Sequence, residues 1–321
     1  MDFRTIVDIE KPGFEIGPCE EMLFVGSCFA TEIGRRFQEE KFRATVNPFG
    51  VMYNPASILH TIEKLFTSKS SVNCKPSARP EGALSSERTV NYQTVFLTLG
   101  TNHVYRLKET GEIVDNCQKR PASLFTEEEL TVDQCADYLQ KAIELLREKN
   151  PDVHIVLTVS PIRYRKYGYH GSQLSKATLL LAIEKLFTVY SLRFTDDYHV
   201  GSDGLASKSS VNCKPSTVNC KPSTVNYFPA YEIVNDELRD YRFYQDDMLH
   251  PSSQAVEYIW QRFSEVYLSD ETKTFLKEWA PLKAALAHKP FDPESEEYRA
   301  FMNKTMLKVA ELQKKYPIFA V

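Results

Sequence analysis

No stretch of this 321-residue sequence approaches the roughly 20 consecutive apolar residues that a membrane-spanning helix needs. The first residues, MDFRTIVDIEKPGFEIGP, also lack the basic segment followed by an apolar segment that is typical of a secretory signal. Lysine and arginine number 39 against 43 aspartate and glutamate, and the sequence has no long basic block. These absences argue against a membrane span and against nucleic acid as a partner, and we expect a cytoplasmic protein.

The cysteines form no Cys-x-x-Cys pair, which is the spacing that zinc sites and redox motifs use. Seven of them are scattered over the chain, at positions 19, 28, 74, 117, 135, 213 and 220. An odd and scattered set predicts reduced thiols and neither a disulfide framework nor a metal site. The first apolar run is not followed by a glycine-rich phosphate loop, which argues against a nucleotide-binding transferase. We therefore expect no metal and no organic cofactor.

Three continuous apolar runs are present, at 22–26, 94–100 and 153–159. Runs that are apolar at every position, rather than at every second one, favour strands of a parallel sheet covered on both faces. Patterns typical of helices lie at 31–42, 55–66, 131–150, 172–190, 228–239 and 251–268. Strands that alternate with helices predict an α/β fold with three layers, α/β/α, around a mostly parallel sheet.

The carboxyl ends of such strands form one edge of the sheet, where α/β proteins bind their ligands. Six polar residues are expected there: Ser27, Cys28, Thr101, Asn102, Ser160 and Arg163. Residues 269–321 read as helices broken by proline, without chemistry of their own. We therefore predict an α/β domain over 1–268 and a helical C-terminal extension over 269–321.

One polar segment, SKSSVNCKPS, occurs at 68–77 and again, letter for letter, at 207–216. TVNCKPS follows at 217–223, and TVNY closes both regions at 89–92 and 224–227. Such short polar copies cannot bury an apolar face, so we interpret 68–92 and 207–227 as surface loops. Their identity indicates a recent duplication or an error in the assembled sequence. We expect no redox or metal role for Cys74, Cys213 and Cys220.

The segment LFVGSCFATEIG places two nucleophile-capable side chains, Ser27 and Cys28, where a buried strand meets a helix. A glycine at the strand end allows a sharp turn, and the first turn of a helix presents unpaired N–H groups. Those groups and the positive end of the helix dipole stabilise a thiolate and a developing oxyanion. The alternative is that Cys28 only packs in the core.

The segment FYQDDMLHPSSQAVEYIW contains Asp247 and His250, three residues apart and just before a helix. At this spacing the carboxylate can accept from one ring nitrogen while the other nitrogen faces a nucleophile. The alternative is a histidine that only leads into the helix, with Ser252 or Ser253 as the cap.

Further polar candidates follow the later strands. Asn102, after LTLG, could donate to an oxyanion, whereas its neighbour His103 could simply cap a turn. Arg163 could anchor a substrate carboxylate or phosphate, or it could form an ion pair at the sheet edge. The segment TDDYHVGSDG at 195–204 suggests a metal superficially, but its spacing fits no calcium loop and favours a plain loop.

These blocks in this order resemble the SGNH, or GDSL-type, esterase superfamily. More closely, GSCFA with NPFGVMYNPASI, NCQKRPASLFT, TVSPIRY, LSKATLLLAI and YFPAYEIVNDELRDYRFYQDDMLHPS resembles the GSCFA domain family, over roughly residues 1–268. The resemblance implies an SGNH-like fold and an ester hydrolase or acyltransferase. One departure is that no histidine lies between His60 and His103, where the family carries a histidine-bearing stretch.

Carried over by position, the resemblance implies that His250, oriented by Asp247, deprotonates Cys28, or Ser27 if the alignment shifts by one residue. It implies that Gly50, in NPFG, and Asn102 help to hold the oxyanion. The expected substrate is a small-molecule or carbohydrate ester, and no cofactor is implied. The alternative is a catalytically inactive module of the same fold that binds carbohydrate or protein.

Overall fold

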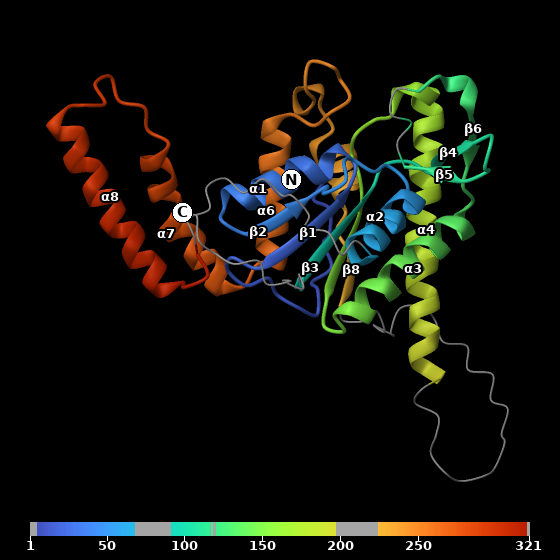
Figure 1. The fold of residues 1–321 in the computed structure, drawn as a ribbon, viewed down its shortest axis with the longest axis horizontal. Coiled ribbons are helices and arrows are strands. Elements are labelled where there is room, and N and C mark those ends of the chain that lie inside the picture. Colours follow the sequence, from blue (N-terminus) through green and yellow to red (C-terminus); the bar gives the residue numbers. More distant parts are fainter. Residues whose placement is uncertain (1–4, 68–90, 116, 118–119, 197–223, 320–321) are drawn as a thin grey trace, which may run out of the picture.

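The computed structural model describes residues 5–67, 91–115, 117, 120–196 and 224–319. These residues form a five-stranded sheet in the order β2-β1-β3-β7-β8, with every neighbouring pair parallel (Figure 1). A separate three-stranded sheet has the order β5-β4-β6. The repeats at 68–77 and 207–223, with Cys74, Cys213 and Cys220, lie outside the described residues. So do Asp197, His199 and Asp203 of the segment considered above for metal.

The three predicted strands form the centre of the parallel sheet. They are β1 (Glu21–Gly26), β3 (Thr94–Leu99) and β7 (His154–Val159). Along β1, Leu23 and Val25 belong to one buried core, and Met22 and Phe24 belong to the other. Because successive side chains point to opposite faces and both faces are covered, the strand is apolar throughout.

Two edge strands escaped prediction, β2 (Arg43–Val46) and β8 (Val225–Tyr227). The prediction of a surface loop over 207–227 is wrong for its last three residues, which form β8 beside β7, with Val225 and Asn226 buried. Each edge strand spans only a few residues, and all residues of β2 are half-buried because a neighbour pairs with it on one side only. So short a segment carries no periodicity, and its position is set by the partner strand.

Helices cover both faces of the sheet, which confirms the three-layer prediction (Figure 1). One face carries α2 (Pro55–Thr67), α3 (Val132–Lys149) and α4 (Gly168–Asp196). The other face carries α1 (Cys28–Glu39) and α6 (Ser253–Tyr267). No described helix has both the length and the apolarity that crossing a membrane would require.

The predicted helix at 228–239 is irregular. A short helix, α5 (Ala230–Glu232), runs directly into a π-helical segment, Ile233–Leu238. The segment ends at Arg239, whose φ of 25 lies in the left-handed region. The apolar spacing that predicted a helix is therefore correct, but it does not distinguish a wider helical turn from an α-helical one.

The second sheet lies beyond the carboxyl end of β3. It consists of β4 (His103–Leu107), β5 (Ile113–Val114) and β6 (Phe125–Glu129), none of which the sequence analysis predicted. The strands have only two to five residues, and β6 is mostly glutamate, so they show too little apolar alternation to be predicted. His103 begins β4 and its ring stacks on that of Tyr167 with centroids 3.6 Å apart, rather than capping a turn.

The C-terminal extension is a helical hairpin of α7 (Asp270–Leu286) and α8 (Glu296–Lys315), at one side of the α/β layers (Figure 1). Its own apolar cluster includes Trp279, Phe319 and the distant Cys19. The indole N–H of Trp279 donates to the carbonyl of Glu39 at 3.2 Å, and Lys283 lies 3.0 Å from the Glu40 carboxylate. The hairpin is thus attached to the C-terminal end of α1.

Candidate active site at the carboxyl edge of the sheet

The turn between β1 and α1 depends on Gly26. Its φ is +146, and a Cβ placed there would lie 2.1 Å from the backbone oxygen of Thr98. The Asn47 side chain accepts from the Gly26 N–H at 2.9 Å and fixes this turn. A side chain at position 26 would push β1 away from β3, so this turn requires glycine.

The two candidate nucleophiles lie in different surroundings. Ser27 is 2% exposed and caps α1, because its hydroxyl accepts from the Phe29 N–H at 3.3 Å. Cys28 is half-buried at the first position of the helix. Within the described part of the chain, its backbone N–H has no hydrogen-bond acceptor, as expected in the first turn of a helix. The serine is therefore engaged in capping, whereas the thiol and an N–H donor lie together.

Tyr53, which the sequence analysis did not single out, contacts the thiol. Its hydroxyl lies 3.7 Å from Sγ of Cys28. Its own carbonyl accepts from the backbone N–H groups of Gly100 and Thr101, each at 2.8 Å, so the tyrosine is fixed to the end of β3. Burial, followed by the contact with Cys28, raises the pKa of Tyr53. The only sequence signal for it was its place in the motif NPFGVMYNPASI.

Asp247 and His250 form the predicted pair. One carboxylate oxygen accepts from the backbone N–H groups of Leu249 at 2.8 Å and His250 at 3.0 Å, and the other lies 2.5 Å from Nδ1 of His250. These bonds, led by the two backbone donors, lower the pKa of Asp247 to about 2. The carboxylate is therefore ionised at neutral pH and orients the ring. Ser252 caps α6, as one of the alternatives predicted.

Helices α1 and α6 run side by side in the same direction. Arg36, eight residues after Cys28, pairs with Glu257, seven residues after His250, at 3.1 Å. Farther along, the rings of Phe37 and Trp260 meet with centroids 4.7 Å apart. Since both helices rise equally per residue, their N-terminal ends lie at the same edge of the sheet. The thiol and the imidazole thus share this edge, although no hydrogen bond joins them in the described structure.

The two further oxyanion donors expected from the sequence have other partners. Gly50 has a φ of +96 and open space around it, and its N–H donates to the Asn47 carbonyl at 2.9 Å. Asn102 is 3% exposed, and its Nδ2 donates to the Leu130 carbonyl at 2.8 Å. Their role in holding an oxyanion stays a prediction.

Arg163 lies beside the His250 loop, and its backbone N–H donates to the Leu249 carbonyl at 3.2 Å. Its guanidinium carbon is 4.1 Å from the ring centroid of Tyr244, 5.7 Å from that of Tyr241 and 5.8 Å from that of Tyr169. Among the described residues no carboxylate forms an ion pair with Arg163, so the predicted alternative of a sheet-edge ion pair is not found there.

Comparison with known proteins identifies the family of this chain. The model of the GSCFA family matches residues 21–79, 70–199 and 186–263. The chain belongs to the GSCFA family. The model described as "GSCFA domain protein, C-terminal domain" matches residues 279–321. The resemblance inferred from the sequence motifs is thereby confirmed, and no curated protein sequence matches the chain significantly.

Several solved structures are similar to this GSCFA protein. A Streptococcus pneumonia protein provisionally described as a platelet activating factor has 13% identity and a TM-score of 0.41, over 77% of this chain and 83% of that one. A family 3 carbohydrate esterase from Talaromyces cellulolyticus has 10% identity and a TM-score of 0.35, over 80% and 98%. One from Clostridium thermocellum has 14% identity and a TM-score of 0.34, over 86% and 98%. Likenesses this distant give no information on the substrate of this GSCFA protein.

Two further residues that the sequence analysis missed, Ser175 and Lys176, hold the loop after β3. Ser175 Oγ accepts from the Asn102 N–H at 3.0 Å and lies 2.9 Å from the Thr101 hydroxyl. Lys176 is fully buried and donates to the Gly100 carbonyl at 2.6 Å. Burial lowers the pKa of Lys176 to about 7. The signal was the SK of LSKATLLLAI, which the periodicity presented only as part of a helix.

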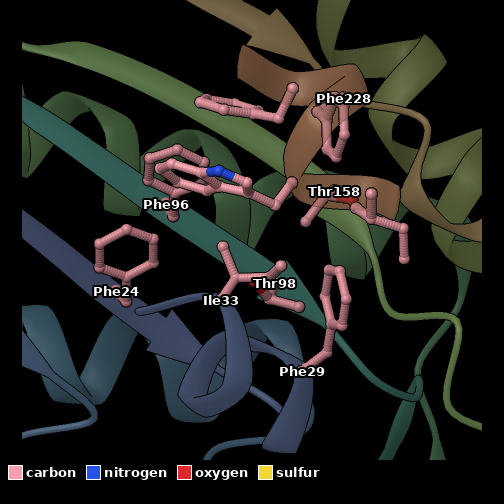
Figure 2. Close-up of a pocket in the computed structure, with 10 residues that line it drawn as sticks. Phe24, Phe29, Ile33, Phe96, Thr98, Thr158 and Phe228 are labelled. Atoms are coloured by element: carbon pink, nitrogen blue, oxygen red, sulfur yellow. The ribbon is translucent and has the colours of Figure 1, made fainter. Parts of the chain in front are cut away.

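One small cavity of this GSCFA protein is too small for a substrate. It holds about 10 Å³ between the sheet and the α1–α6 layer, which is room for about one water molecule. Figure 2 shows it lined by Phe24, Phe29, Ile33, Phe96, Thr98, Thr158 and Phe228. Within the described ranges, no group of three or more His, Cys, Asp or Glu residues is placed to hold a metal ion. The candidate site is the edge that carries Cys28 and His250.

Proposed function

We propose that this GSCFA protein is an ester hydrolase or acyltransferase with Cys28 as its nucleophile and His250 as its general base. The observation that carries the proposal is the parallel pairing of α1 and α6, through Arg36 and Glu257, which brings both helix starts to one edge. The engagement of Ser27 as the α1 cap supports the choice of the thiol over the hydroxyl.

In the proposed reaction, Nε2 of His250 takes the thiol proton while Asp247 holds Nδ1. Sulfur attacks the ester carbonyl, and the carbonyl π electrons move to oxygen, where the free N–H of Cys28 stabilises them. Collapse breaks the bond to the alkoxide, which receives the proton from His250. Water or a second alcohol then attacks the thioester and releases the acyl group.

The expected substrate is a small ester or an acylated carbohydrate. Tyr169 and Tyr241 are 52% and 67% exposed beside the guanidinium of Arg163, so they offer aromatic faces next to a cation. Aromatic faces suit sugar rings, and a guanidinium can take a carboxylate or phosphate in a bidentate manner. In this proposal Arg163 anchors an anionic group on the substrate.

The test is hydrolysis of p-nitrophenyl acetate by purified variants. Cys28→Ala and His250→Ala are expected to abolish it, whereas the matched controls Cys117→Ala and His288→Ala retain it. Ser27→Ala is expected to retain most activity and to lose about 1 kcal/mol of stability with the cap. Mass spectrometry should show an acyl group on the peptide containing Cys28.

Loss of activity in Ser27→Ala alone would move the nucleophile to the serine. Hydrolysis unaffected by all the variants, or absent from the wild type, would instead support the non-catalytic binding module. The absence of a hydrogen bond between Cys28 and His250 within the described structure favours that second candidate. Binding of acylated and deacylated oligosaccharides by calorimetry would then test it.

A further inference from the structure

The oxyanion donors expected by position are engaged, and a different side-chain donor lies at the nucleophile. Gly50 N–H donates to Asn47, and Asn102 Nδ2 donates to Leu130, both within the protein. The hydroxyl of Tyr53, by contrast, lies 3.7 Å from Sγ of Cys28. It comes from the loop after β2, the same loop that carries Gly50.

Tyr53 is held firmly from both sides. Its carbonyl accepts from Gly100 and Thr101, and the preceding residue, Met52, donates its N–H to the Gly26 carbonyl at 2.9 Å. These bonds tie the backbone of Met52 and Tyr53 to the ends of β1 and β3, so the Cα of Tyr53 cannot move away from the thiol without breaking backbone hydrogen bonds. Burial raises the pKa of Tyr53, so the phenol keeps its proton and remains a donor. Such preorganised donors stabilise charge that develops in a transition state.

We propose that Tyr53 is a catalytic residue whose hydroxyl donates first to the Cys28 thiolate and then to the carbonyl oxygen of the tetrahedral intermediate. This inference rests on the proposed function. It assigns to Tyr53 the role of side-chain donor to the oxyanion, which the family resemblance implied for Asn102.

The proton and electron changes are simple. Before attack the thiolate carries the charge and accepts from the phenolic O–H. As the S–C bond forms, the charge moves to the former carbonyl oxygen, and the O–H turns from sulfur to that oxygen. When the bond to the alkoxide breaks, His250 supplies the proton to the leaving group, and Tyr53 never gives up its own.

Tyr53→Phe removes the hydroxyl and keeps the ring. Its matched control is Tyr164→Phe, because the Tyr164 ring lies 6.0 Å from that of Tyr53 in the same aromatic group. Two measurements are made on the full chain: kcat and KM for p-nitrophenyl acetate, and the rate of iodoacetamide alkylation of Cys28 at pH 7, followed by peptide mass spectrometry. The alkylation measurement needs no esterase activity.

We expect Tyr53→Phe to lower kcat about 10²- to 10³-fold at a similar KM, as for other single oxyanion donors. We expect its alkylation of Cys28 to slow about three- to tenfold, because loss of a charge-assisted hydrogen bond is partly offset by a more nucleophilic thiolate. Tyr164→Phe should match the wild type in both measurements.

Alkylation of Tyr53→Phe at the wild-type rate would overturn the contact with the thiolate. A wild-type kcat in Tyr53→Phe, with kcat lost in Asn102→Ala at unchanged thermal stability, would return the side-chain donor role to Asn102. If no variant or wild type hydrolyses ester but alkylation still slows in Tyr53→Phe, the proposed function fails while the hydrogen bond to the thiolate stands.

Discussion

Cys28 and Lys176 show how differently neighbouring polar groups are placed around the same edge. The thiol is half-buried, with the Tyr53 hydroxyl beside it. The amine is fully buried and donates to the Gly100 carbonyl, so it supports the loop after β3 and does not reach a substrate. A buried amine without a carboxylate favours its neutral form, since burial penalises the charge.

The pH dependence of stability should reveal Lys176. Its pKa is about 7 in the folded protein and near 10.5 when the amine is exposed, so between these values the unfolded chain binds the extra proton. The contribution of Lys176 to the unfolding free energy is therefore lowest below pH 7. Between pH 7 and pH 10.5 it rises by about 1.4 kcal/mol per pH unit. In urea unfolding, the unfolding free energy of Lys176→Met minus that of the wild type should be largest at pH 6 and smallest at pH 10. An equal difference at every pH would contradict this assignment.

Among the elements, the turn from β1 into α1 decides where the proposed nucleophile, Cys28, lies. Gly26 has a φ of +146, and an ideal Cβ on it would lie 2.1 Å from the backbone oxygen of Thr98. The next residue, Ser27, caps the helix. The short strand β2 and the loop that follows it bring Asn47 and Tyr53 to the same turn. The site is thus assembled from the ends of several elements and not from one motif.

Gly26→Ala should disrupt this assembly. The new Cβ meets backbone oxygen, which cannot move away as a flexible side chain would, and the φ value is one that alanine rarely adopts. We expect a loss of at least several kcal/mol in unfolding free energy or failure to fold, measured by thermal or urea denaturation. Gly50→Ala is the control, since its φ is also positive but nothing lies within 4 Å. Comparable losses in the two variants would show that position 26 requires glycine because of its φ value, and not because of the nearby Thr98 oxygen.

At the scale of the whole molecule, the C-terminal hairpin and the α/β layers share a core. Cys19 precedes β1 but is buried with residues of α7 and α8, and burial raises its pKa to about 11. Trp279 joins the two parts through the carbonyl of Glu39, which is the last residue of α1. The hairpin therefore covers the end of α1 that is opposite to Cys28.

Trp279→Ala should loosen that shared core. Truncation of a buried tryptophan typically lowers stability by about 3 to 5 kcal/mol, and here it also removes the bond to Glu39. We expect iodoacetamide to alkylate Cys19 faster in this variant, whereas Phe301→Ala, at a 42% exposed position of α8, leaves the rate unchanged. Unchanged protection of Cys19 in Trp279→Ala would show that the hairpin does not shield it.

The amino-acid sequence by itself determined the central strands, the main helices, the family and the Asp247–His250 pair, because each depends on residues close together in the chain. The apolar pattern of a long strand or helix shows which of its faces are buried. The Asp247 carboxylate reaches the His250 ring because the two residues are only three positions apart.

Only the tertiary structure decided which side chains lie beside Cys28, the proposed nucleophile. The edge strands β2 and β8, the contact of Tyr53 with Cys28 and the burial of Lys176 depend on partners far away in the chain. Neither a residue's type nor its neighbours in sequence specify such partners, because they result from how the layers pack. The same packing turned the Asn102 amide toward Leu130 and placed the phenol of Tyr53 at the thiol.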